Sequence, residues 1–344
     1  MRFSKVYLDA FSYELPPNVV TSDELEEKLS AVYDRLKLPF GRLELMSGIK
    51  ERRFWNEGTK PSDGAIMAAR KALRAADCEP SEIDCLLFTS VCRDMMEPAT
   101  ASFIHHGLGL KQECLVFDIS NACLGFLNGM TMMANMLELG QIKKGLIVSG
   151  ETAEDLSNST VDALLRDTSL TRKKLKPSFA SLTIGSGAVA LVMSAEKGTA
   201  LKGKLIGGVY RTDTSNSNLC QGGVNAGSGT LMATDSELLL KKGVEAASLT
   251  WKDFERQMEW PAASISRFFC HQVGSSHAKL LFETLKLDPA KNFETLDFLG
   301  NVGSVSAPIT LAIGIEKGLL TEGDRAAVLG IGSGINCLML GIQW

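Results

Sequence analysis

The sequence predicts an α/β protein built from two similar halves. Apolar runs typical of strands alternate with helical patterns, which favours largely parallel sheets covered by helices on both faces. Residues 184–187 and 331–334 share the sequence Ile-Gly-Ser-Gly, and an apolar strand pattern follows each copy. Residues 138–140 and 316–318 each begin with Glu, end with Gly and precede a further Gly and an apolar strand. This ordered set of matches indicates an internal duplication.

Length and composition restrict the class of protein. The chain of 344 residues is long enough for two domains or one duplicated unit, and its net charge of −4 with no basic stretch argues against nucleic-acid binding. No apolar run reaches membrane-spanning length, and residues 1–5 lack a signal-peptide core, so we expect a cytoplasmic protein without a membrane span. The eight cysteines show no metal-binding spacing, so we expect neither a metal site nor disulfides.

The N-terminal part of the chain predicts four elements in order. Residues 5–10 have the pattern of a strand. Thr21-Ser22-Asp23-Glu24 is a capping box, and it opens a helix whose buried face is formed by Leu25, Leu29, Val32 and Leu36. Residues 48–55 form a basic, aromatic turn and strand, and residues 62–76 form an Ala-rich helix. The region therefore already mixes strand and helix.

The next part of the chain predicts two buried strands and a nucleophile. Residues 84–91 form an apolar strand, a polar loop follows over residues 92–98, and a short helix covers residues 101–108. Residues 114–120 form a second apolar strand, and apolar residues recur at helical spacing from Leu124, Leu127 and Met130 up to Gly140. Cys123 therefore lies where a strand turns into a helix.

The position of Cys123 favours nucleophilic chemistry. A helix N-terminus presents free N–H groups and a partial positive charge, which favour a thiolate over a thiol. The alternative is a small buried core cysteine, and this segment alone does not distinguish the two.

Alignment of the repeats predicts a cap and a partner for the cysteine. The first half carries about thirty extra residues, a polar and charged insert at 151–180, which predicts a surface excursion or a cap over a site. The offset of 147 between the repeats places Cys123 opposite Cys270, next to His271. We therefore expect pseudo-twofold packing to bring the strand ends 115–120 and 265–269 together, and Cys123 close to His271.

Two further features support Cys/His chemistry. Asn301 lies in a Gly-rich loop, Gly300-Asn301-Val302-Gly303-Ser304, which suggests a positioned side chain rather than an ordinary turn residue. Residues 330–334 follow a strand like a dinucleotide-binding loop, but only ten residues remain, and they predict a strand and not a helix. We interpret this segment as a tight turn whose N–H, with that of Cys123, forms an oxyanion hole. No catalytic role is assigned to the other histidines, His105, His106 and His277.

Together, these residues resemble the thiolase superfamily, specifically its ketoacyl-synthase III branch. The resemblance covers the whole chain through Asn121-Ala122-Cys123, His271-Gln272, Gly300-Asn301 and Gly332-Ser333-Gly334. It implies a thiolase-like five-layer αβαβα fold with duplicated halves, here 1–196 with the cysteine and 197–344 with the histidine and asparagine. It also implies a homodimer and a Cys-His-Asn triad.

The resemblance also assigns a role to each site residue. It implies that Cys123 accepts the acyl group and that His271 and Asn301 donate hydrogen bonds to the carbonyl of the second substrate. The N–H groups of Cys123 and Ser333 correspond to the oxyanion hole. Arg52 and Arg53 are candidates to hold the phosphates of coenzyme A, with a solvated surface position as the alternative. We expect no cofactor, because coenzyme A enters as part of the substrate.

Within that branch, residues 90–102 resemble the OleA-type enzymes, which condense two fatty acyl-CoA molecules head to head. In these enzymes the loop glutamate is the base and reaches into the neighbouring subunit, which implies this role for Glu97. A malonyl donor makes its carbanion by losing carbon dioxide, whereas a plain acyl-CoA must lose a carbon-bound proton to a base. A carboxylate in a dry pocket has a raised pKa and is a better base. The alternative for Glu97 is a loop carboxylate paired with Arg93.

The sequence therefore predicts an acyltransferase that joins two long-chain acyl-CoA thioesters into a β-ketoacyl product by a Claisen condensation. The alternative enzyme is a malonyl-dependent 3-oxoacyl-[acyl-carrier-protein] synthase III, which uses an acyl carrier protein and starts fatty acid synthesis. A further alternative is a non-catalytic acyl-CoA-binding or scaffold subunit, against which the presence of Cys123, His271 and Asn301 argues.

Overall fold

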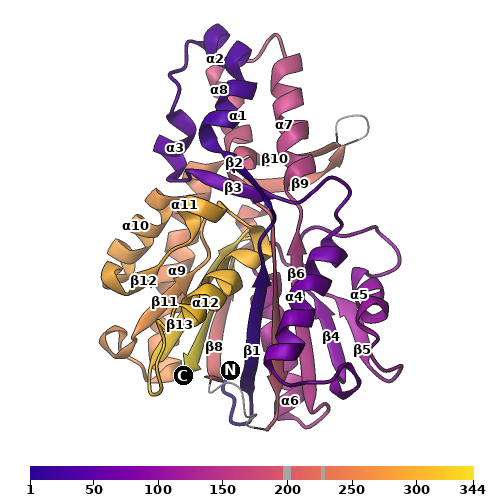
Figure 1. Cartoon of the computed structure of the whole chain (residues 1–344). Helices are drawn as coiled ribbons and strands as arrows, with labels where there is room; N and C mark the ends of the chain where they lie inside the picture. The colour runs from indigo at the N-terminus through magenta and orange to yellow at the C-terminus, as the bar shows by residue number, and fades with distance from the viewer. Residues whose placement is uncertain (197–202, 226–228) are drawn as a thin grey trace.

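One ten-stranded sheet organises the chain. Figure 1 shows the computed structural model, which describes residues 1–196, 203–225 and 229–344. Its strands follow the order β12-β11-β13-β14-β8-β1-β7-β6-β4-β5. At the centre, β1 (Tyr7–Glu14) pairs antiparallel with β8 (Gly203–Thr212) through Tyr7 and Lys204. The expected boundary between residues 196 and 197 falls at the edge of a segment, 197–202, that lies outside the described residues.

The two halves of the sheet share one topology, which confirms the predicted duplication. In each half, two antiparallel pairings lead outward from the central strand and two parallel pairings follow. The corresponding strands, each of the first half with its counterpart, are β7 (Gly187–Ser194) and β14 (Asn336–Gln343), β6 (Lys144–Glu151) and β13 (Arg325–Gly332), β4 (Cys85–Phe88) and β11 (Arg267–Cys270), and β5 (Leu115–Asp118) and β12 (Asn292–Phe293).

The duplication extends to an irregularity in the two central strands. Strand β1 skips Asp9 in its register with β7, and β8 skips Ile206 in its register with β14. The skipped residues occupy equivalent positions, because Tyr7 and Lys204 face the corresponding residues Ser194 and Gln343. The same bulge is therefore built with a carboxylate in one half and an aliphatic side chain in the other.

Helices and sheet halves stack in five layers. Helices α4 (Pro61–Ala75) and α5 (Thr100–Leu108) pack on the outer face of the first half, and α9 (Ser236–Met258) and α10 (Ser275–Leu285) pack on that of the second (Figure 1). Between the halves lie α6 (Gly125–Glu138) and α12 (Ser306–Glu316), whose apolar side chains join strands of both halves in one core. This is the expected αβαβα order.

A smaller cap stands at one end of the sheet, at the top of Figure 1. It combines α1 (Ser22–Lys28), α2 (Ser30–Leu36) and α3 (Arg42–Ser47) with α7 (Glu154–Arg166) and α8 (Arg172–Leu175) around one apolar cluster. Two short ribbons lie beneath it, β2 (Asn18–Thr21) with β3 (Glu51–Phe54) and β9 (Cys220–Asn225) with β10 (Gly229–Thr234). The polar insert at 151–180 is thus part of a cap.

The predicted first helix is correct at its start and wrong in its continuity. Thr21 and Glu24 form the expected reciprocal capping box at the start of α1. The helix ends at Lys28, because Leu29 leaves the helical conformation (φ −97°, ψ 11°), and α2 resumes at Ser30. Leu25, Leu29 and Val32 still face the cap core, so the apolar spacing survives the break.

The pairing predicted between the two halves is wrong. The offset of 147 aligned the strand before Cys123 with the strand before Cys270, whereas β5 corresponds to β12 and β11 corresponds to β4. After the cap insert the interval is 149 residues, from Gly187 at the start of β7 to Asn336 at the start of β14, which is close to that offset. Upstream of the insert the interval is 181 residues, from Lys144 at the start of β6 to Arg325 at the start of β13. Cys123 therefore has its counterpart in the Asn301 loop.

Several absences hold for the part of the chain that the structure describes. The helices there are too short or too polar for any of them to cross a membrane. All eight cysteines are free thiols. Among residues 1–196, 203–225 and 229–344, the metal-ligating side chains do not gather into a group that could hold an ion.

Candidate active site

Cys123 lies in the turn that joins β5 to α6. Ala122, directly before it, has a left-handed backbone (φ 45°), which is uncommon for a residue with a side chain and marks a tightly constrained turn. The turn is closed by a hydrogen bond from the Leu124 N–H to the Asn121 carbonyl at 2.9 Å. A side chain at Gly125 would meet the carbonyl of Thr89 at 2.2 Å, so α6 starts directly against the end of β4. The predicted strand-to-helix position of Cys123 is confirmed.

The predicted effect of this position on the thiol is wrong. Burial, with smaller contributions from the neighbouring Cys220 and Glu151, raises the pKa of the Cys123 thiol to about 12. Desolvation of a charged sulfur outweighs the field of the helix, which begins only at Gly125. Cys123 is therefore a thiol at neutral pH and needs a base to become a nucleophile.

His271 can supply that base. It follows β11, and its backbone N–H donates to the carbonyl of Leu329 on β13 at 2.8 Å. Burial, with a smaller contribution from the nearby His277, lowers the pKa of the imidazole to about 4, so His271 is neutral at pH 7. Its Nδ1 atom is buried without a partner among the described residues. A neutral, unsatisfied imidazole can accept a proton or bind a ligand.

Strand β13 contacts both the His271 backbone and the Cys123 turn. One residue beyond Leu329, a side chain at Gly330 would collide with Leu124 at 2.5 Å. At Gly332, a Cβ atom would lie 3.7 Å from both the backbone nitrogen and the Cβ of Cys123. The end of β13 thus touches the Cys123 turn on one side and bonds to the His271 backbone on the other.

The predicted oxyanion turn also lies at Cys123. The Asn336 side-chain amide donates to Asn121 Oδ1 and to the carbonyl of Ser333, both at 3.1 Å. These two bonds connect the turn that follows Gly332 to Asn121, which lies two residues before Cys123. Its position agrees with the predicted pairing of the Cys123 and Ser333 N–H groups, and their role stays a prediction.

Asn301 is held by the first half of the chain. It follows α11 (Leu296–Leu299) and Gly300, its N–H donates to the Thr183 carbonyl at 3.0 Å, and its own carbonyl accepts from Gly185 at 2.9 Å. Its Oδ1 accepts from the Gly303 N–H at 3.1 Å. Within the described residues, the Nδ2 amide group is what remains of this side chain to donate to a ligand.

Glycines allow this close approach. Gly300 has a left-handed backbone (φ 68°), and a Cβ atom there would lie 2.7 Å from the Thr183 carbonyl and 3.3 Å from the Cβ of Arg52. A Cβ atom at Gly185 would lie 2.2 Å from the carbonyl of Leu299. The Gly-rich loop predicted to position Asn301 does so because two backbone segments touch there.

The predicted role of Arg52 is wrong. Arg52 is completely buried, donates to the Val20 carbonyl at 3.3 Å and to Ser22 Oγ at 3.1 Å, and has its pKa lowered to about 10 by desolvation. It supports the base of the cap and cannot reach a phosphate in solvent. Arg53 is half-buried, and its guanidinium donates to the Pro16 carbonyl at 3.3 Å. Its phosphate-binding role stays a prediction.

Glu97 occupies a different environment from the buried residues. It is exposed in the loop between β4 and α5, and the described ion pairs do not include one between Arg93 and Glu97. The loop is fixed at its far end, where Asp118 accepts from the N–H groups of Thr100 and Ala101 at 2.9 Å. Within one chain, Glu97 therefore faces solvent and not the Cys123 thiol.

Glu151 is a polar residue of the site that the sequence did not single out. It was grouped with the polar insert, yet it ends β6, is 3% exposed and acts on the pKa of Cys123. The available signal was its place two residues after the apolar run at 146–149. A charged side chain at the end of a buried strand is rarely fully buried unless it has a partner.

Family models match two stretches of the chain. Residues 117–213 match the model of 3-oxoacyl-[acyl-carrier-protein] synthase III, and residues 256–344 match the model of its C-terminal part. Two relatives, both named acyl-CoA:acyl-CoA alkyltransferase, align over the full length of both chains. The relative from Shewanella oneidensis is 42% identical, and that from Xanthomonas campestris is 37% identical.

Solved structures of an OleA protein share the fold of this chain. A cerulenin-bound crystal structure of Xanthomonas campestris OleA matches with a TM-score of 0.95 and 37% identity, and covers 100% of this chain and 98% of that chain. A cysteine-to-serine variant of the same protein with bound lauric acid and lauroyl-CoA matches with a TM-score of 0.94, 37% identity and coverage of 99% and 100%. Other structures of that protein carry substitutions of a glutamate or a histidine.

Proposed function

This chain belongs to the 3-oxoacyl-[acyl-carrier-protein] synthase III family, and we propose that it joins two long-chain acyl-CoA molecules by a non-decarboxylative Claisen condensation. The observation that carries this proposal is the full-length 42% identity to an acyl-CoA:acyl-CoA alkyltransferase. The geometry supports it, because a partly buried cysteine, a neutral histidine and an asparagine amide lie at the end of one sheet.

The first stage transfers an acyl group to Cys123. His271 takes the proton of the thiol, because its imidazole is neutral at pH 7. The sulfur attacks the thioester carbonyl of the first acyl-CoA, and the N–H groups of Cys123 and Ser333 stabilise the oxyanion. The carbonyl re-forms, the bond to the sulfur of coenzyme A breaks, and the departing thiolate takes the proton from His271.

The second stage forms the carbon–carbon bond. Glu97 removes a proton from the α-carbon of the second acyl-CoA, and His271 and Asn301 donate to the oxygen of the resulting enolate. The α-carbon attacks the acyl group on Cys123, and the carbon–sulfur bond to Cys123 breaks. The product is a β-ketoacyl-CoA, and the proton that Glu97 removed returns to the Cys123 thiolate, so both groups regain their starting state.

The spacing of Glu97 supports its role as the base. Residues 97 and 123 lie 26 positions apart in this chain, and the glutamate and cysteine substituted in the OleA structures are also 26 positions apart. An isolated carboxylate in solvent is a weak base, so Glu97 needs a dry environment that the single chain does not provide.

We infer that a homodimer provides that environment. The loop that carries Glu97 also exposes Val91, Met95 and Met96, of which Met96 is 97% exposed. Within the described residues, β5 forms the edge of the large sheet, and its first residue, Leu115, is 51% exposed. An apolar loop beside an open sheet edge is suited to burial against a second copy, which would place Glu97 in the partner's site.

Product analysis tests the function. The protein is incubated with lauroyl-CoA alone, and then with lauroyl-CoA and malonyl-[acyl carrier protein], while free coenzyme A, carbon dioxide and product masses are measured. We expect condensed β-keto product from lauroyl-CoA alone, without carbon dioxide from the acyl donor. Product only with the malonyl donor, with one carbon dioxide per condensation, would instead support the malonyl-dependent synthase, which the comparisons do not favour.

A further inference from the structure

Glu151 is a buried carboxylate for which the proposed mechanism has no chemical step. Its Oε1 atom accepts hydrogen bonds from the Val91 N–H at 3.0 Å, the Ser304 N–H at 3.2 Å and the Ser304 hydroxyl at 2.6 Å. Its Oε2 atom accepts from the Cys92 N–H at 3.0 Å. Four donors occupy the carboxylate, so it is poorly suited to accept a substrate proton and well suited to hold its neighbours.

A chain of buried hydroxyls ends on the same carboxylate. Ser304 donates its one hydroxyl hydrogen to Glu151, so Ser149, 2.7 Å away, donates to Ser304. By the same reasoning Ser90, 2.8 Å from Ser149, donates to Ser149 and accepts from the Gly150 N–H at 2.8 Å. Every hydroxyl hydrogen in the chain thus has a defined acceptor, and such a network has one favoured arrangement.

Through Glu151, this network connects the two loops that act in condensation. Val91 and Cys92 begin the loop of the first half that carries Glu97, and Ser304 follows Asn301 by three residues in the second half. The contact is close, because a Cβ atom at Gly303 would lie 3.1 Å from Glu151 Oε1. Glu151 therefore joins the base loop to the enolate-binding loop across the interface of the two halves.

We propose that Glu151 is a positioning residue for carbon–carbon bond formation, which rests on the function proposed above. It fixes the start of the loop that carries Glu97 into the partner's site, and it holds the Asn301 loop of its own site. Both groups that act in condensation therefore depend on this one carboxylate. The acylation of Cys123 uses neither Glu97 nor Asn301. Loss of Glu151 is therefore expected to slow condensation much more than acylation.

The test measures the two stages separately in the full-length protein. Glu151→Gln keeps the shape of the side chain but turns an NH2 group toward backbone N–H donors. Single-turnover release of coenzyme A from lauroyl-CoA reports acylation, and product formation per acylated Cys123 reports condensation. We expect condensation to fall about 30-fold or more, a loss of the size seen when one positioned group is removed. Acylation should not fall, because the loss of the Glu151 charge removes one cause of the raised pKa of Cys123. Glu154→Gln, three residues further on, is the matched charge control and should change neither stage.

A second variant guards against misfolding of the first. Ser304→Ala removes only one of the four bonds to Glu151 and leaves the carboxylate in place, so we expect a smaller loss confined to condensation. If both variants fold and slow acylation and condensation equally, or slow neither, the positioning role is wrong. Wild-type protein in the same assay separates the two proposals: no condensed product from lauroyl-CoA alone overturns the proposed function, whereas an active wild type with an equally active Glu151→Gln overturns only the role of Glu151.

Discussion

The loops that follow β4 and β11 occupy the same place in the two halves and differ in direction and length. After β11 the chain passes through His271 and enters α10 at Ser275, and both His271 and Gln272 are held inside the protein. After β4 the loop is longer, reaches α5 only at Thr100, and exposes Met96 and Glu97. The two halves therefore share one topology, but the loop after β11 lies inside the protein, and we call it the inward loop. The loop after β4 is exposed, and we call it the outward loop.

The difference shows how a duplicated scaffold can serve an asymmetric reaction. The strand order and even the bulge at Asp9 and Ile206 are shared, because they are fixed by backbone pairing. The chemistry resides in the loops at the strand ends, where length is free to vary. The inward loop completes the site for acylation within one chain, and the outward loop needs a second copy to exclude water from Glu97.

The largest effect is expected from the nucleophile, which the inward loop serves. Cys123→Ala should abolish covalent labelling by lauroyl-CoA and lower product formation to background, because Cys123 is the thiol proposed to accept the acyl group. Mass spectrometry of the intact protein measures the label. Cys220→Ala, a change in a second free thiol close to Cys123, is the control and should retain labelling. An acylated Cys123→Ala protein would contradict the assignment.

The outward loop is tested next by Glu97→Gln. Because the amide cannot accept the α-proton, we expect condensation to fall about 10²- to 10⁴-fold while Cys123 is still acylated. Exchange of the α-hydrogen of the second acyl-CoA with deuterated water should fall in parallel. Glu113→Gln, in the exposed turn before β5, is the control. Normal condensation by Glu97→Gln would leave Glu97 as a structural loop carboxylate.

The inward loop has its own signature in pH. Burial lowers the pKa of His271 to about 4, so its imidazole should be unprotonated, and free to accept a proton, at pH values well above 4 and become protonated as the pH falls through 4. We expect the acylation rate to lack the usual inflection of histidine near pH 6.5, and His271→Ala to lower the rate about 10²-fold or more. Stopped-flow measurement of coenzyme A release would show this, and an inflection near 6.5 that His271→Ala removes would contradict it.

The contact of the outward loop with a second copy is tested by Met96→Glu. A charge at this 97% exposed position should weaken a dimer that buries the side chain, and should lower condensation in proportion to the lost dimer. Analytical ultracentrifugation over a range of concentrations measures the association. Leu139→Glu, a 73% exposed apolar position at the end of α6, is the matched control. An unchanged dimer in Met96→Glu would place the interface elsewhere.

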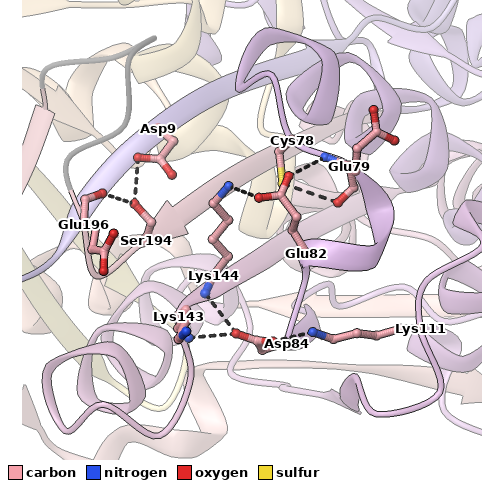
Figure 2. Close-up of polar contacts among 10 residues, drawn as sticks. All are labelled: Asp9, Cys78, Glu79, Glu82, Asp84, Lys111, Lys143, Lys144, Ser194 and Glu196. Carbon is pink, nitrogen blue, oxygen red and sulfur yellow. Dashed lines mark hydrogen bonds and ion pairs between the residues drawn. The ribbon is translucent and has the colours of Figure 1, made fainter.

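The smallest effect concerns the shared bulge. Burial raises the pKa of Asp9 to about 6, while the Ser194 hydroxyl and the charge of Lys144 lower it only in part; Figure 2 shows the Ser194 contact and Lys144 in the same region. Because the folded-state pKa exceeds the unfolded value of 3.8, this group favours the folded state most below pH 4, and that contribution is lost as the pH rises through 6.

The loss is on the order of 3 kcal/mol in the free energy of unfolding, and Asp9→Asn should remove it. Urea unfolding measures the free energy of unfolding of both proteins between pH 4 and 7. As the pH rises, this free energy should decline in the wild type relative to Asp9→Asn. Asp23→Asn, an exposed carboxylate in the first turn of α1, is the control. Parallel pH dependence in wild type and Asp9→Asn would show that Asp9 is already ionised without penalty.

The sequence by itself determined the local pattern and its repetition. The periodicities set the alternation of strands and helices, the capping box set the start of α1, and the Ile-Gly-Ser-Gly repeat revealed the duplication. They also placed Cys123 between a strand and a helix, and they placed His271 and Asn301 at the ends of elements. These features depend on residues close together in the chain, so a linear pattern contains them.

Only the tertiary structure decided what those residues experience. The true counterpart of Cys123 depends on which strands pair across the sheet, and a loop insertion hid this from a fixed offset. The pKa of Cys123 and the burial of Arg52 are set by desolvation, which sums over atoms brought from distant segments. Glu151 gained its four donors from two loops that are more than 200 residues apart in sequence, and no local pattern records such a meeting.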